Sequence, residues 1–157
     1  MDSKKPILER IYSTFGEVAK TIGYSPIHGK IIAALMVNGE LSLQALAKET
    51  GYSISMISLS LDLLEIMGVI RKSRKSGDRN LYISLQGDLL EALKSAIVMR
   101  ISKSIGSTLA DIRESRSEIE SLPQPERERA TKSIEILERE IRRLESYVNI
   151  LSKARLP

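Results

Sequence analysis

The chain has 157 residues, with 24 Lys and Arg against 20 Asp and Glu, one His, no Cys and no Trp. This length is typical of one domain, and a chain without Cys has no disulfide, no thiolate nucleophile and no Cys-ligated metal site. The single His28 cannot build a histidine metal cage, so we expect no metal and no cofactor.

Membrane and secretion signals are absent from the sequence pattern. A membrane helix needs roughly 18 consecutive apolar residues. The longest apolar run, Ile31 to Val37, has seven. The first residues also lack the charged and apolar regions of a signal peptide, so we expect a cytoplasmic protein with no membrane partner.

The first part of the chain predicts two helices. Apolar residues recur at spacings of three and four over residues 6–22, which is typical of an amphipathic helix, and Gly23 ends it. A Ser-Pro pair then supplies the N-cap and first turn of a helix over residues 26–37, which an Asn-Gly pair ends. His28 lies in the first turn of this second helix, where we expect a structural or surface role.

Two shorter helices follow, joined by a tight turn. Ser42 caps a helix over residues 43–49, Thr50 to Tyr52 form the turn, and Ser53 caps a helix that runs to Met67 and ends at Gly68. This is the length and order of a helix-turn-helix.

Small and apolar residues strengthen the prediction of a helix-turn-helix. Ala47 lies where the two helices approach closely, and Gly51 supplies the positive φ of the turn. Ile57 returns an apolar side chain to the core beneath the turn, and Leu46 and Tyr52 close it.

A basic β-hairpin is predicted directly after the helix-turn-helix. Residues 69–72 and 81–83 form its strands, and Ser76 to Asp78 mark its turn. The segment from Gly68 to Asn80 carries five basic residues and one Asp, which equals the net charge of +4 of the whole chain. The basic residues are Arg71, Lys72, Arg74, Lys75 and Arg79. Such a patch suits a polyphosphate partner, and the alternative is an exposed loop that happens to be basic.

The rest of the chain predicts two long helices. Gly87 and Asp88 begin one that extends to about Leu122, and residues 126–153 form the other after two prolines. The last helix has apolar residues at spacings of 3, 4, 3, 4 and 3, which is an a/d seam about 42 Å long. Its partner is the preceding long helix, a second chain, or both. The seam residues are Ile134, Leu137, Ile141, Leu144, Val148 and Leu151.

Residues 30–85 resemble the winged helix-turn-helix of MarR-type transcription regulators. The likeness is strongest over Ser58 to Lys72, with the Gly-Asp-Arg-Asn segment of residues 77–80 behind it. The leading helix and the two trailing helices are most similar to the GbsR-like branch of these regulators. The resemblance implies a dimer made by terminal helices, a second motif helix in the major groove and a wing that reaches the minor groove.

The resemblance also implies functional residues. Ser55, Met56, Ser58 and Leu59 correspond to the groove-facing residues, and Asp78 with Arg79 to the wing tip. This sequence departs from the usual pattern because residues 53–67 contain no Arg, Asn or Gln, the side chains that make bidentate contacts to bases. We therefore expect affinity to come from the wing, from Lys48 and from helix N-termini such as the one that Ser53 caps.

The predicted fold is mainly helical, with a small β-hairpin wing and a long C-terminal helical hairpin. Residues 1–24 form an N-terminal dimerisation helix through Ile7, Ile11 and Phe15, residues 25–86 the winged helix-turn-helix, and residues 87–157 the dimerisation hairpin. The predicted partners are double-stranded DNA, bound at a pseudo-palindromic operator, and a second copy of the chain. Nothing in the sequence marks the site of a small-molecule effector.

Three other functions compete with DNA binding. A winged helix that serves as a protein-protein adaptor is the main alternative, since an acidic second helix suits one. RNA binding is less favoured because no aromatic platform is available for stacking bases. An enzymatic function is the weakest hypothesis, because the sequence lacks a Gly-rich phosphate-binding loop and a His near a nucleophile.

Overall fold

The computed structural model describes residues 5–157, so the first four residues of the predicted N-terminal region lie outside it. The chain divides into two compact units, with the boundary between Ala92 and Leu93. The elements, in order, are α1 (Lys5–Thr21), α2 (Pro26–Asn38), β1 (Leu41–Ser42), α3 (Leu43–Thr50), α4 (Ile54–Ile66), β2 (Ile70–Arg74), β3 (Leu81–Leu85), α5 (Leu89–Ile119) and α6 (Glu126–Lys153).

The first unit is built around α2. Ile31 and Leu35 of this helix are fully buried, together with Leu46 of α3 and Ile57 and Leu61 of α4. These apolar side chains come from three short helices that have little stability alone, so their shared burial holds the helices together. The predicted core positions Leu46 and Ile57 are confirmed.

Helix α1 packs closely on α2. Tyr12, Gly16 and Ala19 form its buried face. A Cβ atom on Gly29 of α2 would lie 2.0 Å from the carbonyl oxygen of Phe15, so glycine is required at this approach of the two backbones.

A polar network joins α1 to the helix-turn-helix. The Tyr12 hydroxyl donates to Glu49 Oε2 at 3.3 Å and accepts from Asn38 Nδ2 at 3.1 Å. Burial raises the pKa of Tyr12, so its hydroxyl keeps its proton. The network ties α1, α2 and α3 together at a buried position.

The sheet has three strands, in the order β1-β3-β2, and both pairs are antiparallel. The prediction of a two-stranded hairpin was therefore incomplete, because Leu41 and Ser42 add a third strand that pairs with Ile83 and Tyr82. The strands β2 and β3 also extend beyond the predicted ranges. Ile70 and Ile83 face the core, while Arg71 and Arg74 are exposed.

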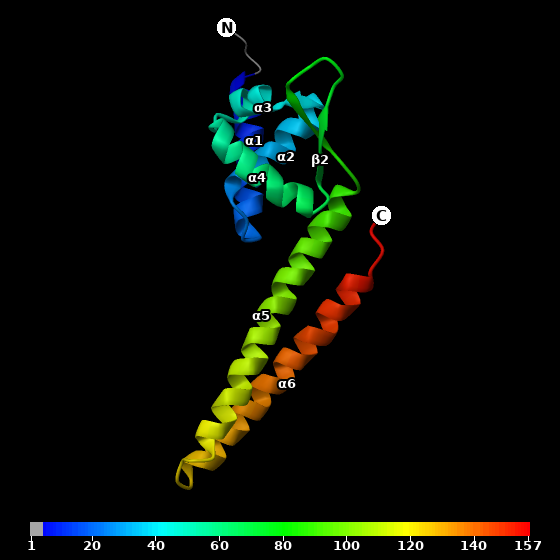
Figure 1. The fold of residues 1–157 in the computed structure, drawn as a ribbon. Coiled ribbons are helices and arrows are strands. Elements are labelled where there is room, and N and C mark those ends of the chain that lie inside the picture. The colour runs from blue at the N-terminus through cyan, green and yellow to red at the C-terminus, as the bar shows by residue number, and fades with distance from the viewer. Residues whose placement is uncertain (1–4) are drawn as a thin grey trace. The chain divides into compact units, whose positions relative to one another are not determined.

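The predicted helix boundaries lie within two residues of the observed ones, except at the C-terminal end of α5. The long helix α5 ends at Ile119, three residues before the predicted end. Ser25 precedes α2 but makes no side-chain capping hydrogen bond, whereas Ser42 and Ser53 cap α3 and α4 as expected. The fold is the predicted one: a winged helix-turn-helix with long C-terminal helices (Figure 1).

The second unit is a helical hairpin of α5 and α6 (Figure 1). At one end of the pair, Lys94 Nζ donates to the carbonyl oxygen of Ala154 at 2.7 Å. Toward the other end, Arg116 pairs with Glu138 at 2.5 Å. These two contacts join α5 to α6.

Gly51 provides a test of the turn. Its φ of 74° lies in the left-handed region, as predicted. We expect Gly51→Val to lower the free energy of unfolding by about 1–3 kcal/mol, because a β-branched residue is strained there. Gly106→Ala is the control, since no atom lies within 4 Å of its added Cβ and alanine favours a helix. Urea denaturation measures both, and an unchanged stability for Gly51→Val contradicts the argument.

His28 makes stability depend on pH. Burial lowers its pKa from the usual 6.5, a backbone hydrogen bond at Ser25 opposes this shift, and its Nδ1 has no hydrogen-bond partner among the described residues. As pH falls through 6.5 the unfolded chain takes up a proton first, so the folded state loses stability until its own pKa is reached. We expect the free energy of unfolding, measured by urea denaturation, to fall between pH 7.5 and 5.5. The His28→Gln variant should lack this contribution to the pH dependence. Equal pH dependence in the two proteins contradicts the assignment.

Candidate nucleic-acid interface

The N-terminus of α4, which follows the turn after α3, is exposed. The Ser53 hydroxyl accepts from the backbone N–H of Met56 at 3.3 Å, so this hydroxyl serves as the cap of α4. Lys30 of α2, which the sequence analysis did not select, lies 5.2 Å from the centre of the Tyr52 ring, one residue before this cap. A helix N-terminus with a cation nearby favours an anion.

The exposed sector of α4 is mostly apolar. Leu59 and Met56 are 76% and 50% exposed, and Ile66 is 84% exposed at the other end of the helix. The predicted groove residues Ser55 and Ser58 are exposed as well. The four predicted groove residues, Ser55, Met56, Ser58 and Leu59, are therefore all exposed on α4. They present two hydroxyl groups and two apolar side chains to solvent.

The two carboxylates of α4 are paired with the wing. Lys72 Nζ of β2 lies 2.6 Å from Asp62 Oδ1 and 3.0 Å from Glu65 Oε2. The hydrogen bond to Asp62 is the main reason that the pKa of Lys72 is raised. The charge of Lys72 is thus matched by carboxylates within the chain, which joins α4 to β2.

A second pair fixes the base of the wing turn. Lys75 Nζ lies 2.6 Å from Glu40 Oε1 and 4.0 Å from the centre of the Tyr82 ring. The hydroxyl of Tyr82 donates to Asp78 Oδ2 at 2.6 Å, and Asp78 Oδ1 accepts from the backbone N–H of Asn80. These hydrogen bonds, that of Tyr82 first, lower the pKa of Asp78. Asp78 therefore orders the turn.

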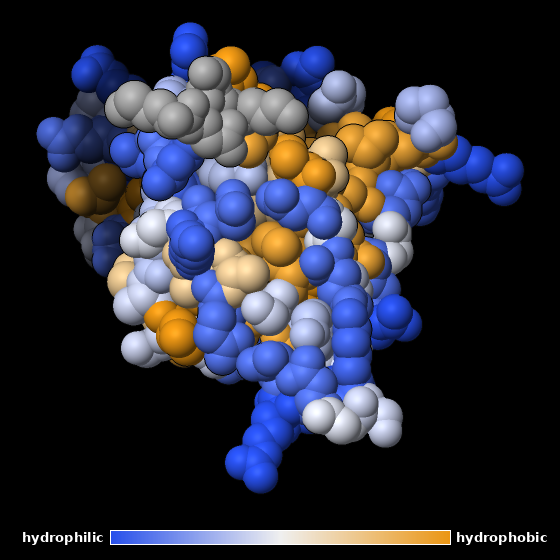
Figure 2. Space-filling view, turned by 90° about the horizontal axis from the view of Figure 1, so that it is seen from above, coloured by the Kyte–Doolittle hydropathy of each residue, from blue (hydrophilic) through white to orange (hydrophobic). Residues whose placement is uncertain are grey.

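Three cations of the wing make no ion pair with any other described residue: Arg71, Arg74 and Arg79. All three are exposed, and so is Lys48 at the C-terminal end of α3. Figure 2 shows, from above, hydrophilic side chains interspersed with apolar ones on the molecular surface. The sequence identified all five wing cations, but the structure separates two that are paired from three that are not.

The predicted dimerisation residues divide into two groups. Val148 of α6 is buried within the chain, and Ile134 and Ile141 are partly buried. Their seam neighbours Leu137, Leu144 and Leu151 are 55%, 42% and 37% exposed. Three of the six seam residues are therefore buried or partly buried within the chain, and the other three are exposed.

The predicted residues of α1 show a similar division. Ile7 and Ile11 are 54% and 39% exposed. Phe15 is partly buried against the core of the first unit. The exposed pair continues toward Val18, which is 52% exposed, on a side of α1 separate from its buried Tyr12.

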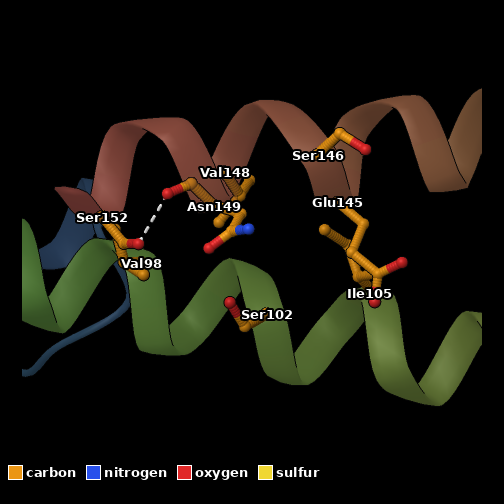
Figure 3. A pocket seen from close by; sticks show the side chains of 8 residues that line it. All are labelled: Val98, Ser102, Ile105, Glu145, Ser146, Val148, Asn149 and Ser152. Carbon is orange, nitrogen blue, oxygen red and sulfur yellow. Dashed lines mark hydrogen bonds between the residues drawn. The ribbon is translucent and has the colours of Figure 1, made fainter. Parts of the chain in front are cut away.

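A groove of about 430 Å³ that is open to solvent lies between α5 and α6. Figure 3 shows Ser102 of α5 and Asn149 of α6 pointing into it. Ile105 and Val148 also line it, so apolar and polar side chains from both helices face a space that the hairpin alone does not fill.

Residues 5–157 contain neither a metal site nor a membrane-spanning helix. No group of three or more His, Cys, Asp or Glu in this range is arranged to hold a metal ion. None of the helices in this range is both long enough and apolar enough to cross a membrane.

Comparison with known proteins supports the assignment of the fold. A family model for winged helix-turn-helix DNA-binding domains matches residues 24–71, from just before α2 into β2. No curated protein matches the sequence. A solved structure described as a transcriptional regulator is 17% identical, with a TM-score of 0.54, and the match covers 95% of this chain and 100% of that one. At this identity the likeness shows the fold alone.

Two further structures are more distant. The regulator NadR in complex with 4-hydroxyphenylacetate is 18% identical, with a TM-score of 0.43, over 75% of this chain and 89% of that one. BpsR of Bordetella bronchiseptica, whose DNA binding is regulated by 6-hydroxynicotinic acid, is 16% identical, with a TM-score of 0.44, over 84% and 96%. These similarities are too weak to support an inference. The fold and the family model define a winged helix-turn-helix domain followed by a helical hairpin.

Proposed function

We propose that this chain is a sequence-specific DNA-binding transcriptional regulator that acts as a homodimer on a pseudo-palindromic operator. The observation that carries the proposal is the set of unpaired wing cations, Arg71, Arg74 and Arg79, in the same unit as an exposed helix of a helix-turn-helix. Arginines that neutralise phosphates release counterions, and this term supplies much of the affinity of DNA-binding proteins.

The proposal extends the resemblance to MarR-type regulators, and to their GbsR-like branch, to the whole chain. It is supported by the motif over residues 58–72 and by the order of the elements. In this arrangement α4 enters the major groove and the wing reaches the minor groove. The function requires no catalytic residue or cofactor and agrees with the cytoplasmic location expected from the sequence.

The homodimer is supported by apolar side chains that the chain leaves exposed. Leu137, Leu144 and Leu151 recur every seven residues on α6, which is the spacing of a coiled-coil contact. The exposed Ile7 and Ile11 of α1 supply a second apolar stripe. A two-fold symmetric dimer places its two recognition helices about 34 Å apart, one turn of DNA, so a pseudo-palindromic site follows.

The adaptor function remains the second candidate, because one observation favours it. Met56, Leu59, Leu63 and Ile66 form an exposed apolar stripe on α4, at spacings of three, four and three residues. Protein partners bind such stripes through an apolar groove or helix. An adaptor does not require unpaired arginines on its wing, whereas a DNA-binding protein uses them to contact phosphates. Only the DNA-binding protein should therefore lose affinity for DNA steeply as the salt concentration rises.

We expect the wing arginines to set the salt dependence of DNA binding. Each phosphate contact contributes about −0.9 to the slope of log affinity against log salt, so three contacts in each protomer give a dimer a slope of about −5. Arg74→Gln removes one contact from each protomer and should flatten the slope by about 2, on specific and random duplexes alike. Fluorescence anisotropy at several salt concentrations measures these slopes.

The control for this test is Glu40→Gln combined with Lys75→Gln, which removes a paired cation together with its carboxylate and leaves the net charge unchanged. Its slope should match that of the parent protein. If Arg74→Gln and Arg79→Gln also bind with the parent's affinity and slope, the wing does not contact DNA and the adaptor becomes the better function.

We expect the exposed half of the α6 seam to hold the dimer. Leu144→Glu places a charge at a position that is 42% exposed in the single chain, so the chain should fold but associate poorly. Light scattering at micromolar concentration should show a dimer for the parent and a monomer for this variant. Ile150→Glu is the matched control, because Ile150 is 68% exposed but lies outside the seam. A monomeric parent protein contradicts the proposed dimer.

A further inference from the structure

The face of α4 that would enter a groove lacks the usual base-reading groups. Ile57, Leu61 and Leu64 are buried on the inner side of the helix. The opposite side presents the apolar side chains of Met56 and Leu59 and the hydroxyls of Ser55 and Ser58. Neither a guanidinium nor a carboxamide is present between Ile54 and Ile66.

The remaining polar groups of α4 are already engaged. The Ser53 hydroxyl accepts from the N–H of Met56 as the helix cap. The carboxylates of Asp62 and Glu65 contact Lys72 at 2.6 and 3.0 Å. Lys72 thus offsets one of the two negative charges of α4 and contacts both carboxylates. The base-reading capacity of α4 therefore comes from two hydroxyls and from apolar atoms.

Apolar side chains recognise one feature of the major groove. An A·T pair presents the thymine 5-methyl group beside its polar N7, N6 and O4 groups, whereas a G·C pair presents the polar O6, N7 and N4 groups and no methyl group. An apolar side chain pressed against those polar groups leaves them without hydrogen-bond partners, which is unfavourable. The same side chain gains by burying a methyl group.

We propose that Met56 and Leu59 recognise thymine methyl groups, so that the operator has A·T pairs where α4 meets the major groove. This inference rests on the proposed function and adds the class of DNA sequence that the site selects. The three unpaired arginines of the wing favour DNA over a protein for this face, because an apolar stripe in the same unit as free cations suits a polyanion that carries methyl groups.

The chain offers a matched control for this role. Ile66 is 84% exposed and apolar like Leu59, but it lies seven residues farther along α4. At 1.5 Å per residue this is about 10 Å along the helix axis, beyond the N-terminal half that reads bases in helix-turn-helix proteins. Ile66→Ala and Leu59→Ala remove similar exposed apolar area at positions with different access to bases.

In the experiment, the full-length chain first selects the duplexes that it binds from a random pool. The selected site is then synthesised with dT or with dU, which lacks the 5-methyl group, in the half-sites. We expect dU to weaken binding about fourfold for each contacted thymine, which corresponds to about 0.8 kcal/mol for one buried methyl. Leu59→Ala should bring the dT to dU affinity ratio toward one, and Ile66→Ala should keep the parent's ratio.

The outcomes separate the inference from the proposed function. Equal affinity for dT and dU sites, with salt-dependent and sequence-selective binding intact, overturns methyl recognition and leaves the regulator function standing. A selected site with G·C pairs throughout the half-sites also overturns it. Retention of no duplex at low salt overturns the regulator function itself. If Ile66→Ala and Leu59→Ala lower the dT to dU affinity ratio equally, the assignment of methyl recognition to Leu59 is overturned. The whole apolar stripe of α4 would then contribute to the ratio.

Discussion

The ion pairs of Lys72 with Asp62 and Glu65 determine which charges of the first unit remain available. Lys72 and the buried Ile70 lie on the same face of β2, and Lys72 reaches two carboxylates of α4 from there. Lys72 offsets one of the two negative charges of α4, which weakens the repulsion between this helix and a DNA phosphate backbone. The same contact joins the sheet to the helix, so the wing and α4 are linked by charge as well as by their apolar core.

In the proposed complex with DNA, this pairing divides recognition between two groups of residues. Arg71, Arg74 and Arg79 supply charge without sequence information, because every duplex presents the same phosphates. Met56 and Leu59 supply sequence information without charge, through contacts that depend on the base. This division explains how a helix without arginine, asparagine or glutamine fits a DNA-binding fold, provided that the wing carries the affinity.

Local signals made most of the fold predictable from the sequence. Residues 126–153 were predicted as a helix and form α6, because periodicity and flanking prolines act within a few residues. The strand β1 was missed, because two residues become a strand through pairing with β3, far along the chain. The partners of Lys72 and Lys75 were missed for the same reason, since charge counting does not show which side chains meet in space.

The half-exposed seam of α6 connects assembly to specificity. One protomer offers three wing arginines and a few methyl contacts, whereas a regulator must distinguish its operator from a very large number of competing sites. In the proposed dimer, two copies joined through Leu137, Leu144 and Leu151 would add their binding free energies, so the discrimination of one half-site would be multiplied by that of the other.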